Sequence, residues 1–320
     1  MIGAQAAKDE SGQAPANAPE ESAVLLDGKA DVSPASSGGT IDGAVRSYLM
    51  ATANVGELSD WVSWANGASL GWQSSRFAGF GVGARFYATV ATAGNATALD
   101  PTTGRPSRYE LGLYDVVAKE RADTALLGEA YLDFAASGHH VWLGRHRLKS
   151  PLINPQDGRM IPSLVQGVWY EGSFDRRLKL QLGYLSHVAP RSTGGFYSAA
   201  DSIGLYPSGR SVIGQPSAYA GRLESAGVFV GSAAYRTPLF RAQAWDYLVE
   251  NIFNTVYLEV GVRPKDRHLG YIVDAQVLAQ QRLGQGGSDG FNQRPVVDRQ
   301  LVSLCDWSDP GSEADGETVG

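Results

Sequence analysis

The chain has 320 residues, of which 43% are hydrophobic and only 19% are charged, and its formal net charge at pH 7 is -6. This acidic balance excludes nucleic acid as an expected partner, because phosphate binding needs a clustered basic surface. The single cysteine, Cys305, excludes an intrachain disulfide and a cysteine-based zinc site. The 39 glycines favour strands and turns over a helical bundle, because glycine costs about 1 kcal/mol inside a helix.

Residues 1–39 are rich in Ala, Pro, Ser, Glu and Gly and show no sustained periodicity, so we expect a disordered leader. No signal peptide with a basic start and an apolar middle is visible. The opening residues fit a mature exported chain as well as a cytoplasmic one. No stretch approaches the roughly 18 apolar residues of a membrane helix.

After Gly43 the sequence changes to short segments of alternating hydrophobicity, which predict strands. The clearest is 82–90, where Val82 and Phe86 alternate with Arg85 and Tyr87. Segments 178–184 and 252–263 repeat this pattern. Weaker candidates are 44–52, 66–74, 126–134, 140–144, 166–172, 226–235, 240–248, 271–281 and 297–305. These segments together predict an all-β chain of about a dozen strands.

Alternation alone leaves two interpretations open. In a soluble β-sandwich the apolar face points to a core, and in a membrane barrel it points to lipid. Strands of about nine to eleven residues and the alternation of short and long connections favour the barrel. Aromatic residues near strand ends, expected as interface girdles, favour it too: Trp61, Trp64, Phe77, Trp142, Trp169, Tyr184, Trp245 and Tyr247.

The most distinctive segment is 143–162, in which three prolines and no hairpin signal follow a strand that ends at Gly144. Gly144-Arg145, then residues 151–162 (PLINPQDGRMIP), then Gly167, resemble the constriction-loop signature of the OprD family of outer-membrane porins. Weaker matches are found at 45–50, 128–132, 189–192 and 244–247, so the resemblance covers roughly residues 41–285.

The resemblance implies a transmembrane antiparallel β-barrel of the eighteen-stranded porin type, whose third outer loop folds inward. It implies passive, partly selective diffusion of small polar or charged solutes, such as amino acids or carboxylates, through the outer membrane of Gram-negative bacteria. The expected partners are membrane lipid, lipopolysaccharide, these solutes and the barrel assembly machinery. The expected state is a monomer or a homotrimer. A secreted or surface β-sandwich that binds partners without conducting is the alternative.

The same resemblance assigns the pore constriction. By position in the motif its basic side chains are Arg145 and Arg159, then Arg147 and Lys149, and its opposing carboxylate is Asp157. Prolines stiffen such a loop, and facing charges in a narrow pore select solutes by charge. His146 stands where family members usually have Gln, and it adds a charge that depends on pH near 6.5.

Parity along the strands predicts which residues face the lumen and which face lipid. The lumen candidates are Arg85, Glu129, Asp133, Glu171, Lys179, Glu259, Arg263 and Asp274. The lipid candidates are Ala84, Phe86, Leu180, Leu182, Val256 and Leu258.

Other chemistry is set aside. His139 and His140 are adjacent and point to opposite faces of a strand, so they do not converge with His146 on a metal. No nucleophile elbow is present, and the glycines of 284–290 form no phosphate loop. We therefore expect no enzyme activity, no catalytic residues and no cofactor.

The length of the chain limits how many strands the barrel can have. Eighteen strands need on the order of 400 residues. We therefore expect residues 40–305 to form an incomplete barrel whose sheet stays open. We expect 306–320 to form a tail that is unlike a native closing strand and adds no strand.

Overall fold

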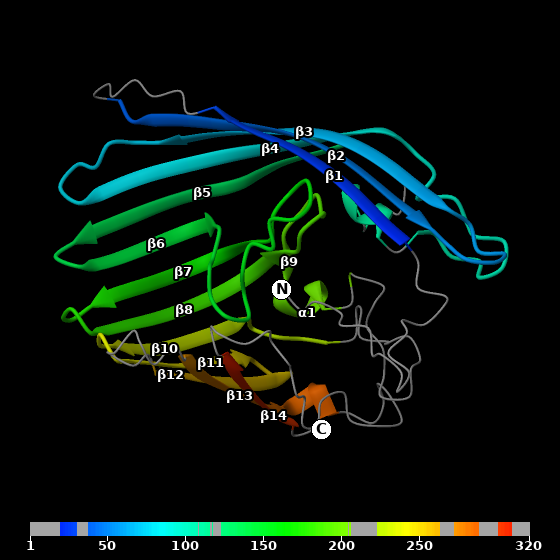
Figure 1. Ribbon diagram of the computed structural model, residues 1–320. Coiled ribbons are helices and arrows are strands. Elements are labelled where there is room, and N and C mark those ends of the chain that lie inside the picture. Colours follow the sequence, from blue (N-terminus) through cyan, green and yellow to red (C-terminus); the bar gives the residue numbers. More distant parts are fainter. Residues whose placement is uncertain are drawn as a thin grey trace.

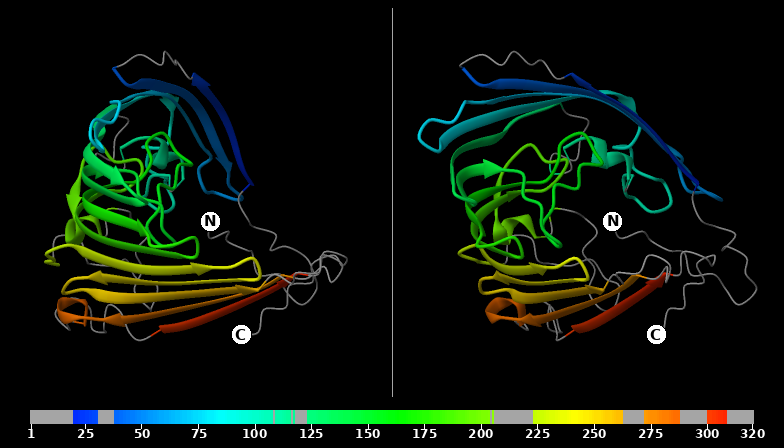
Figure 2. Two further views of the ribbon diagram at one scale, coloured as in Figure 1. Left: turned by 90° about the vertical axis from the view of Figure 1, so that its left-hand side faces the viewer. Right: turned by 60° about the vertical axis from the view of Figure 1, so that its left-hand side comes forward.

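The computed structural model describes residues 20–30, 38–107, 109–115, 117, 123–203, 205, 223–262, 272–287 and 300–308. These residues form one antiparallel sheet of fourteen strands, in which β9 pairs only with β8 and the others follow chain order from β1 to β14. Figures 1 and 2 show a single curved layer with β1 and β14 at its two edges and loops on its concave side. The predicted open, antiparallel all-β sheet is confirmed.

The strands are β1 (Glu20–Ala30), β2 (Thr40–Ala53), β3 (Trp61–Gln73), β4 (Phe80–Gly94), β5 (Thr124–Ala136), β6 (His139–His146), β7 (Leu164–Ser173), β8 (Leu178–Ala189), β9 (Tyr197–Ser198), β10 (Val228–Arg236), β11 (Phe240–Val249), β12 (Phe253–Val262), β13 (Ile272–Arg282) and β14 (Gln300–Ser308). Three short helices, η1 (Glu110–Leu113), α1 (Ala199–Ser202) and η3 (Gly284–Gly287), lie in the connections. In the described part of the chain, no helix has the length and apolar character needed to cross a membrane.

Every strand predicted from alternation is present, and two expectations at the chain ends need correction. β1 lies within residues 1–39, which we expected to be disordered, and it pairs with β2 along its whole length. Composition did not reveal β1, because its stabilising contacts are backbone hydrogen bonds to a neighbour. β14 continues to Ser308, past the predicted start of the tail, and 309–320 lie outside the described residues.

The two faces of the sheet differ in polarity as predicted. On β12, Val256 and Leu258 are exposed on the convex face, whereas Thr255, Tyr257 and Glu259 are buried on the concave face. β4 shows the same alternation, with Phe86 47% exposed and Tyr87 6% exposed. A soluble sandwich would hide its apolar face beneath a second sheet. The described strands form a single layer with the apolar face outward, so the sandwich alternative is wrong.

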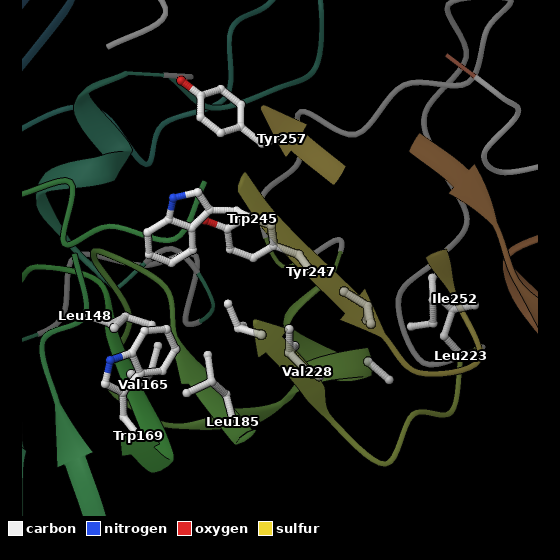
Figure 3. Packing of buried hydrophobic residues seen from close by; sticks show 14 of the residues in the cluster. Leu148, Val165, Trp169, Leu185, Leu223, Val228, Trp245, Tyr247, Ile252 and Tyr257 are labelled. Atoms are coloured by element: carbon white, nitrogen blue, oxygen red, sulfur yellow. The ribbon is translucent and has the colours of Figure 1, made fainter. Parts of the chain in front are cut away.

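The protein core lies on the concave side, where loop residues pack on the sheet. Figure 3 shows one cluster, in which Leu148 from a loop lies beside Trp169, Trp245 lies next to Tyr247, and Leu223 from another loop lies beside Ile252. These three aromatic residues and Trp142 are buried on the inner face, so our prediction that they belong to a lipid-facing girdle is wrong. Whether such a residue faces the concave or the convex side depends on its odd or even position along the strand, and not on its place near the strand end. Trp64 and Phe77 are exposed, as a girdle requires.

Candidate pore constriction

Residues 147–163 connect β6 to β7 and turn back across the concave face of the sheet. Asp157 of this loop lies 2.7 Å from the guanidinium of Arg46 on β2, and Arg46 also donates to the backbone carbonyl of Arg159. Arg159 in turn donates to the Tyr48 hydroxyl on β2 at 3.3 Å. The loop thus leaves the wall at β6 and is fastened to β2, four strands away in the sheet. This is the inward-folded loop that the sequence predicts.

Charged groups gather where the loop meets β2 and β4. We call this set the eyelet cluster, and it consists of Asp42, Arg46, Arg85, Glu129, Arg147, Asp157 and Arg159. Arg85 lies 2.5 Å from Asp42 and 3.2 Å from Glu129, and Arg147 lies 3.0 Å from the same Glu129 oxygen. The Tyr87 hydroxyl also donates to Glu129, at 2.8 Å. One carboxylate, 4% exposed, therefore holds two guanidiniums in place.

Strand parity and two glycines explain why these residues meet. Asp42 and Arg46 share the inner face of β2, as Arg85 does on β4. Between them, on β3, a Cβ at Gly71 would lie 2.5 Å from the Arg85 guanidinium. A Cβ at Gly67 would lie 2.8 Å from the Ala88 carbonyl and 2.9 Å from Met160 of the loop. The missing side chains on β3 thus leave the room that Arg85 and the loop occupy.

A cavity of about 240 Å³ opens at the eyelet cluster. Five members of the cluster line it: Asp42, Arg46, Arg85, Arg147 and Asp157. The whole cluster holds four guanidiniums and three carboxylates, a formal sum of +1. Arg147 and Asp157 are each more than 40% exposed at the side chain, so the cavity presents both signs of charge to a solute. Opposed charges in a narrow passage orient a polar solute and select it by charge.

The predicted constriction residues fall into three groups. Arg147, Asp157 and Arg159 lie in the eyelet cluster, together with the lumen candidates Arg85 and Glu129. Lys149 is exposed on the loop beyond them. Arg145 lies outside the eyelet cluster, and its side chain is on the convex face of the sheet.

Register fixes the face of Arg145. Its neighbour Leu143 is 58% exposed on the convex face, and residues two apart on a strand share a face. The Arg145 guanidinium donates to the Gln166 side chain at 2.9 Å and to the Leu127 carbonyl at 3.3 Å, and it lies 4.4 Å above the Phe196 ring. Our expectation that Arg145 reaches into the lumen is therefore corrected. Motif position does not determine which face a strand residue occupies.

The remaining lumen candidates form ion pairs nearer the short turns. Lys179 lies 2.5 Å from Glu171, and Arg241 lies 2.8 Å from Asp274 and 3.2 Å from Glu259. Asp133 is 2% exposed, pairs with Arg76, and lies 3.1 Å from His140. Arg263 lies outside the described residues.

Asp42 and Arg46 belong to the eyelet cluster and Tyr87 contacts it, and none of the three was predicted as a site residue. Alternation between Ile41 and Met50 was the available signal, because Asp42, Arg46 and Tyr48 share the parity opposite to the exposed Val45 and Leu49. Within the described ranges no three metal-ligating side chains come together. His139 bonds to Tyr170, whereas His140 lies beside Asp133.

No family model and no curated protein matches this sequence. Solved structures do match. Acinetobacter baumannii OccAB3 is 16% identical, with a TM-score of 0.62, over 85% of this chain and 64% of its own. Pseudomonas aeruginosa outer membrane protein OpdK is 14% identical, with a TM-score of 0.58, over 84% and 62%. A structure of OpdK with vanillate is 17% identical, with a TM-score of 0.56, over 84% and 62%.

The chain therefore spans less than two thirds of the length of these proteins. At this identity the likeness establishes the fold. The fold is that of the OprD (Occ) outer-membrane porins, as the constriction-loop resemblance predicted.

Proposed function

We propose that the chain forms the constricted wall of a passive porin of the Gram-negative outer membrane, which admits small polar solutes that carry a carboxylate. The observation that carries the proposal is the eyelet cluster on the polar inner face of a sheet whose outer face is apolar. A soluble protein has no use for an outward apolar face, and a barrel in lipid requires one. The fold shared with OccAB3 and OpdK supports the same function.

The charge of the cluster supports the solute class. Four guanidiniums against three carboxylates favour an anion or a zwitterion that presents its carboxylate. Among the arginines of the cluster that form described ion pairs, Arg147 has the most exposed side chain, and a planar guanidinium binds a carboxylate through two parallel hydrogen bonds. OpdK, which shares the fold, has been crystallised with vanillate, an aromatic carboxylate.

The test is conductance of the purified chain in a planar bilayer of neutral phospholipid, with vanillate or glucose added on one side. We expect channel-like conductance that vanillate blocks and that glucose at the same concentration leaves unchanged. Arg147→Gln is expected to weaken the block. Arg236→Gln, which removes the same charge near the short turns, is the matched control. Bilayers without conductance, or equal block by both solutes, would contradict the proposal.

A further inference from the structure

A groove with a basic side chain lies on the convex face of the sheet, at the point where β6 ends. β5 pairs with β6 only from Ala130 onward, so its earlier residues continue past the end of β6. Arg145 lies at this corner and contacts both flanking strands, through Gln166 on β7 and the carbonyl of Leu127 on β5. We call the hollow beside it the Arg145 groove. It has a volume of about 430 Å³ and is lined in part by Leu127, Leu143, Val168 and Tyr184.

Backbone and a bulge contribute to the lining of the groove. Gly144 and Gly167, which pair across β6 and β7, both line it. On β8, Ser186 is an extra residue, since Gln166 pairs with His187 and Gly167 pairs with Leu185. A bulge of this kind re-aims side chains at the end of a sheet.

Polarity on the convex face changes at this level. Leu143, Val168 and Leu182 form the exposed apolar surface toward the short turns. Arg145, Gln166 and Ser186 follow on the side of the long loops, and all three line the groove. The Tyr184 ring stands beside them, and its hydroxyl donates to the Ala226 carbonyl at 2.6 Å. An apolar band that ends in a tyrosine and a polar row is typical of a membrane interface.

Arg145 has capacity left for an anion. A guanidinium carries five N–H donors, and its described hydrogen bonds to protein use two of them. Arg145 is the one basic or acidic side chain among the described residues that line the groove. A cation at the edge of lipid, without a carboxylate beside it, favours an anionic partner, and a guanidinium fork matches phosphate.

We infer that the Arg145 groove binds a phosphorylated glycolipid of the outer leaflet, with its phosphate on Arg145 and an acyl chain along Leu143 and Val168. The inference rests on the proposed function, because it takes the long loops to lie outside the cell. The apolar lining argues for a lipid over a soluble anion. Apolar contacts and a phosphate contact together then hold the lipid at a fixed point on the wall.

The probe is lipid A with two phosphates, titrated into the purified chain in neutral detergent and followed by native mass spectrometry. We expect Arg145→Gln to weaken binding about tenfold, because a charge-assisted contact is lost. Arg236→Gln, the matched control, should bind as wild type does. Lipid A stripped of its phosphates should bind as weakly to wild type as intact lipid A binds to Arg145→Gln.

A second variant keeps Arg145 in place in case its removal prevents folding. Ser186→Asp puts a carboxylate into the groove beside the guanidinium, and we expect it to lower lipid A binding to a similar degree. Equal binding by wild type and Ser186→Asp would overturn the inference. So would equal competition by phosphatidylglycerol or by inorganic phosphate, since either assigns the groove to another anion. A protein that conducts in a neutral bilayer and fails these tests loses only this inference, whereas one that does not conduct loses the proposed function.

Discussion

Glu129 is the most informative single site in the constriction. Its carboxylate is buried and accepts contacts from Arg85, Arg147 and Tyr87 within 3.2 Å. Glu129→Gln keeps the size and an acceptor oxygen and removes the charge. The formal sum of the eyelet cluster then rises from +1 to +2. The pore should admit anions more readily, because a passing anion meets one more uncompensated guanidinium.

The magnitude follows from Coulomb's law. A unit charge about 6 Å from the path of an ion, in a passage of effective dielectric constant about 40 to 80, contributes about 0.7 to 1.4 kcal/mol. That energy corresponds to about a threefold to tenfold change in the ratio of anion to cation permeability. Arg85 keeps Asp42 as a partner, and Arg147 is 42% exposed at its side chain, so neither guanidinium is left fully buried and unpaired. The loss of folding stability should therefore stay below the roughly 3–5 kcal/mol of a broken buried pair.

The assay is the reversal potential of the channel in a bilayer with a salt gradient. The control is Glu57→Gln, which removes the same charge from an exposed loop between β2 and β3 and should leave selectivity unchanged. Wild-type selectivity in Glu129→Gln would refute a role for this carboxylate in the pore. A shift toward cations would refute the charge argument, because its sign would then be wrong.

Three further predictions follow from the two faces of the sheet and from a loop carboxylate. Phe86→Arg and Leu258→Arg should each lower the free energy of unfolding in lipid by about 2–4 kcal/mol, measured by urea titration in vesicles. Wild-type stability of both variants would contradict the assignment of the convex face to lipid. Arg159→Ala should shift permeability toward cations by about the factor estimated for Glu129, in the opposite direction, with little change in stability; an unchanged reversal potential would remove Arg159 from the pore. Asp100 accepts backbone N–H groups from Ser59 and Thr103, and these bonds lower the pKa of its carboxyl to about 2. Because the folded pKa lies below the unfolded value, the attachment between loops 54–60 and 95–107 should be intact above about pH 4 and weaken as the pH falls toward 2. Hydrogen exchange at Ser59 and Thr103 measures this, Asp100→Asn should show the loosened state at neutral pH, and protection that is equal at pH 2 and pH 6 would contradict it.

The wall of this protein could be predicted from the sequence because alternation is a local property. Val82 to Val90 and Thr255 to Val262 alternate without interruption, and the structure assigns their faces as their parity predicts, whereas Ile252, just before β12, turns into the core. Glu129 lies on the concave face, although the strand around it is irregular. A bulge leaves Gly128 without a partner on β4, so Leu126 and Glu129, three residues apart, both lie on the concave face.

The constriction could be predicted only in part, because its contacts depend on register and on the path of a loop. Arg46 and Asp157 are 111 residues apart, and nothing local to either residue specifies the other. Arg145 was assigned to the pore by its place in a motif, whereas its pairing with Ala130 and Gln166 puts it on the convex face. Burial of Trp142 and Trp169 under Leu148 likewise depends on where the loop leaves the wall.

The most direct test of the central claim is the environment of alternate positions on β12. With Cys305→Ser as background, single cysteines at Thr255, Val256, Tyr257 and Leu258 are reconstituted in vesicles and carry a fluorescent label. We predict that a quencher confined to the bilayer dims labels at Val256 and Leu258. Labels at Thr255 and Tyr257, which the structure places on the opposite, concave face, should be dimmed less than those two. Labels that show no alternation, or alternate in the opposite sense, would contradict a sheet with lipid on its convex face and a wet pore on its concave face.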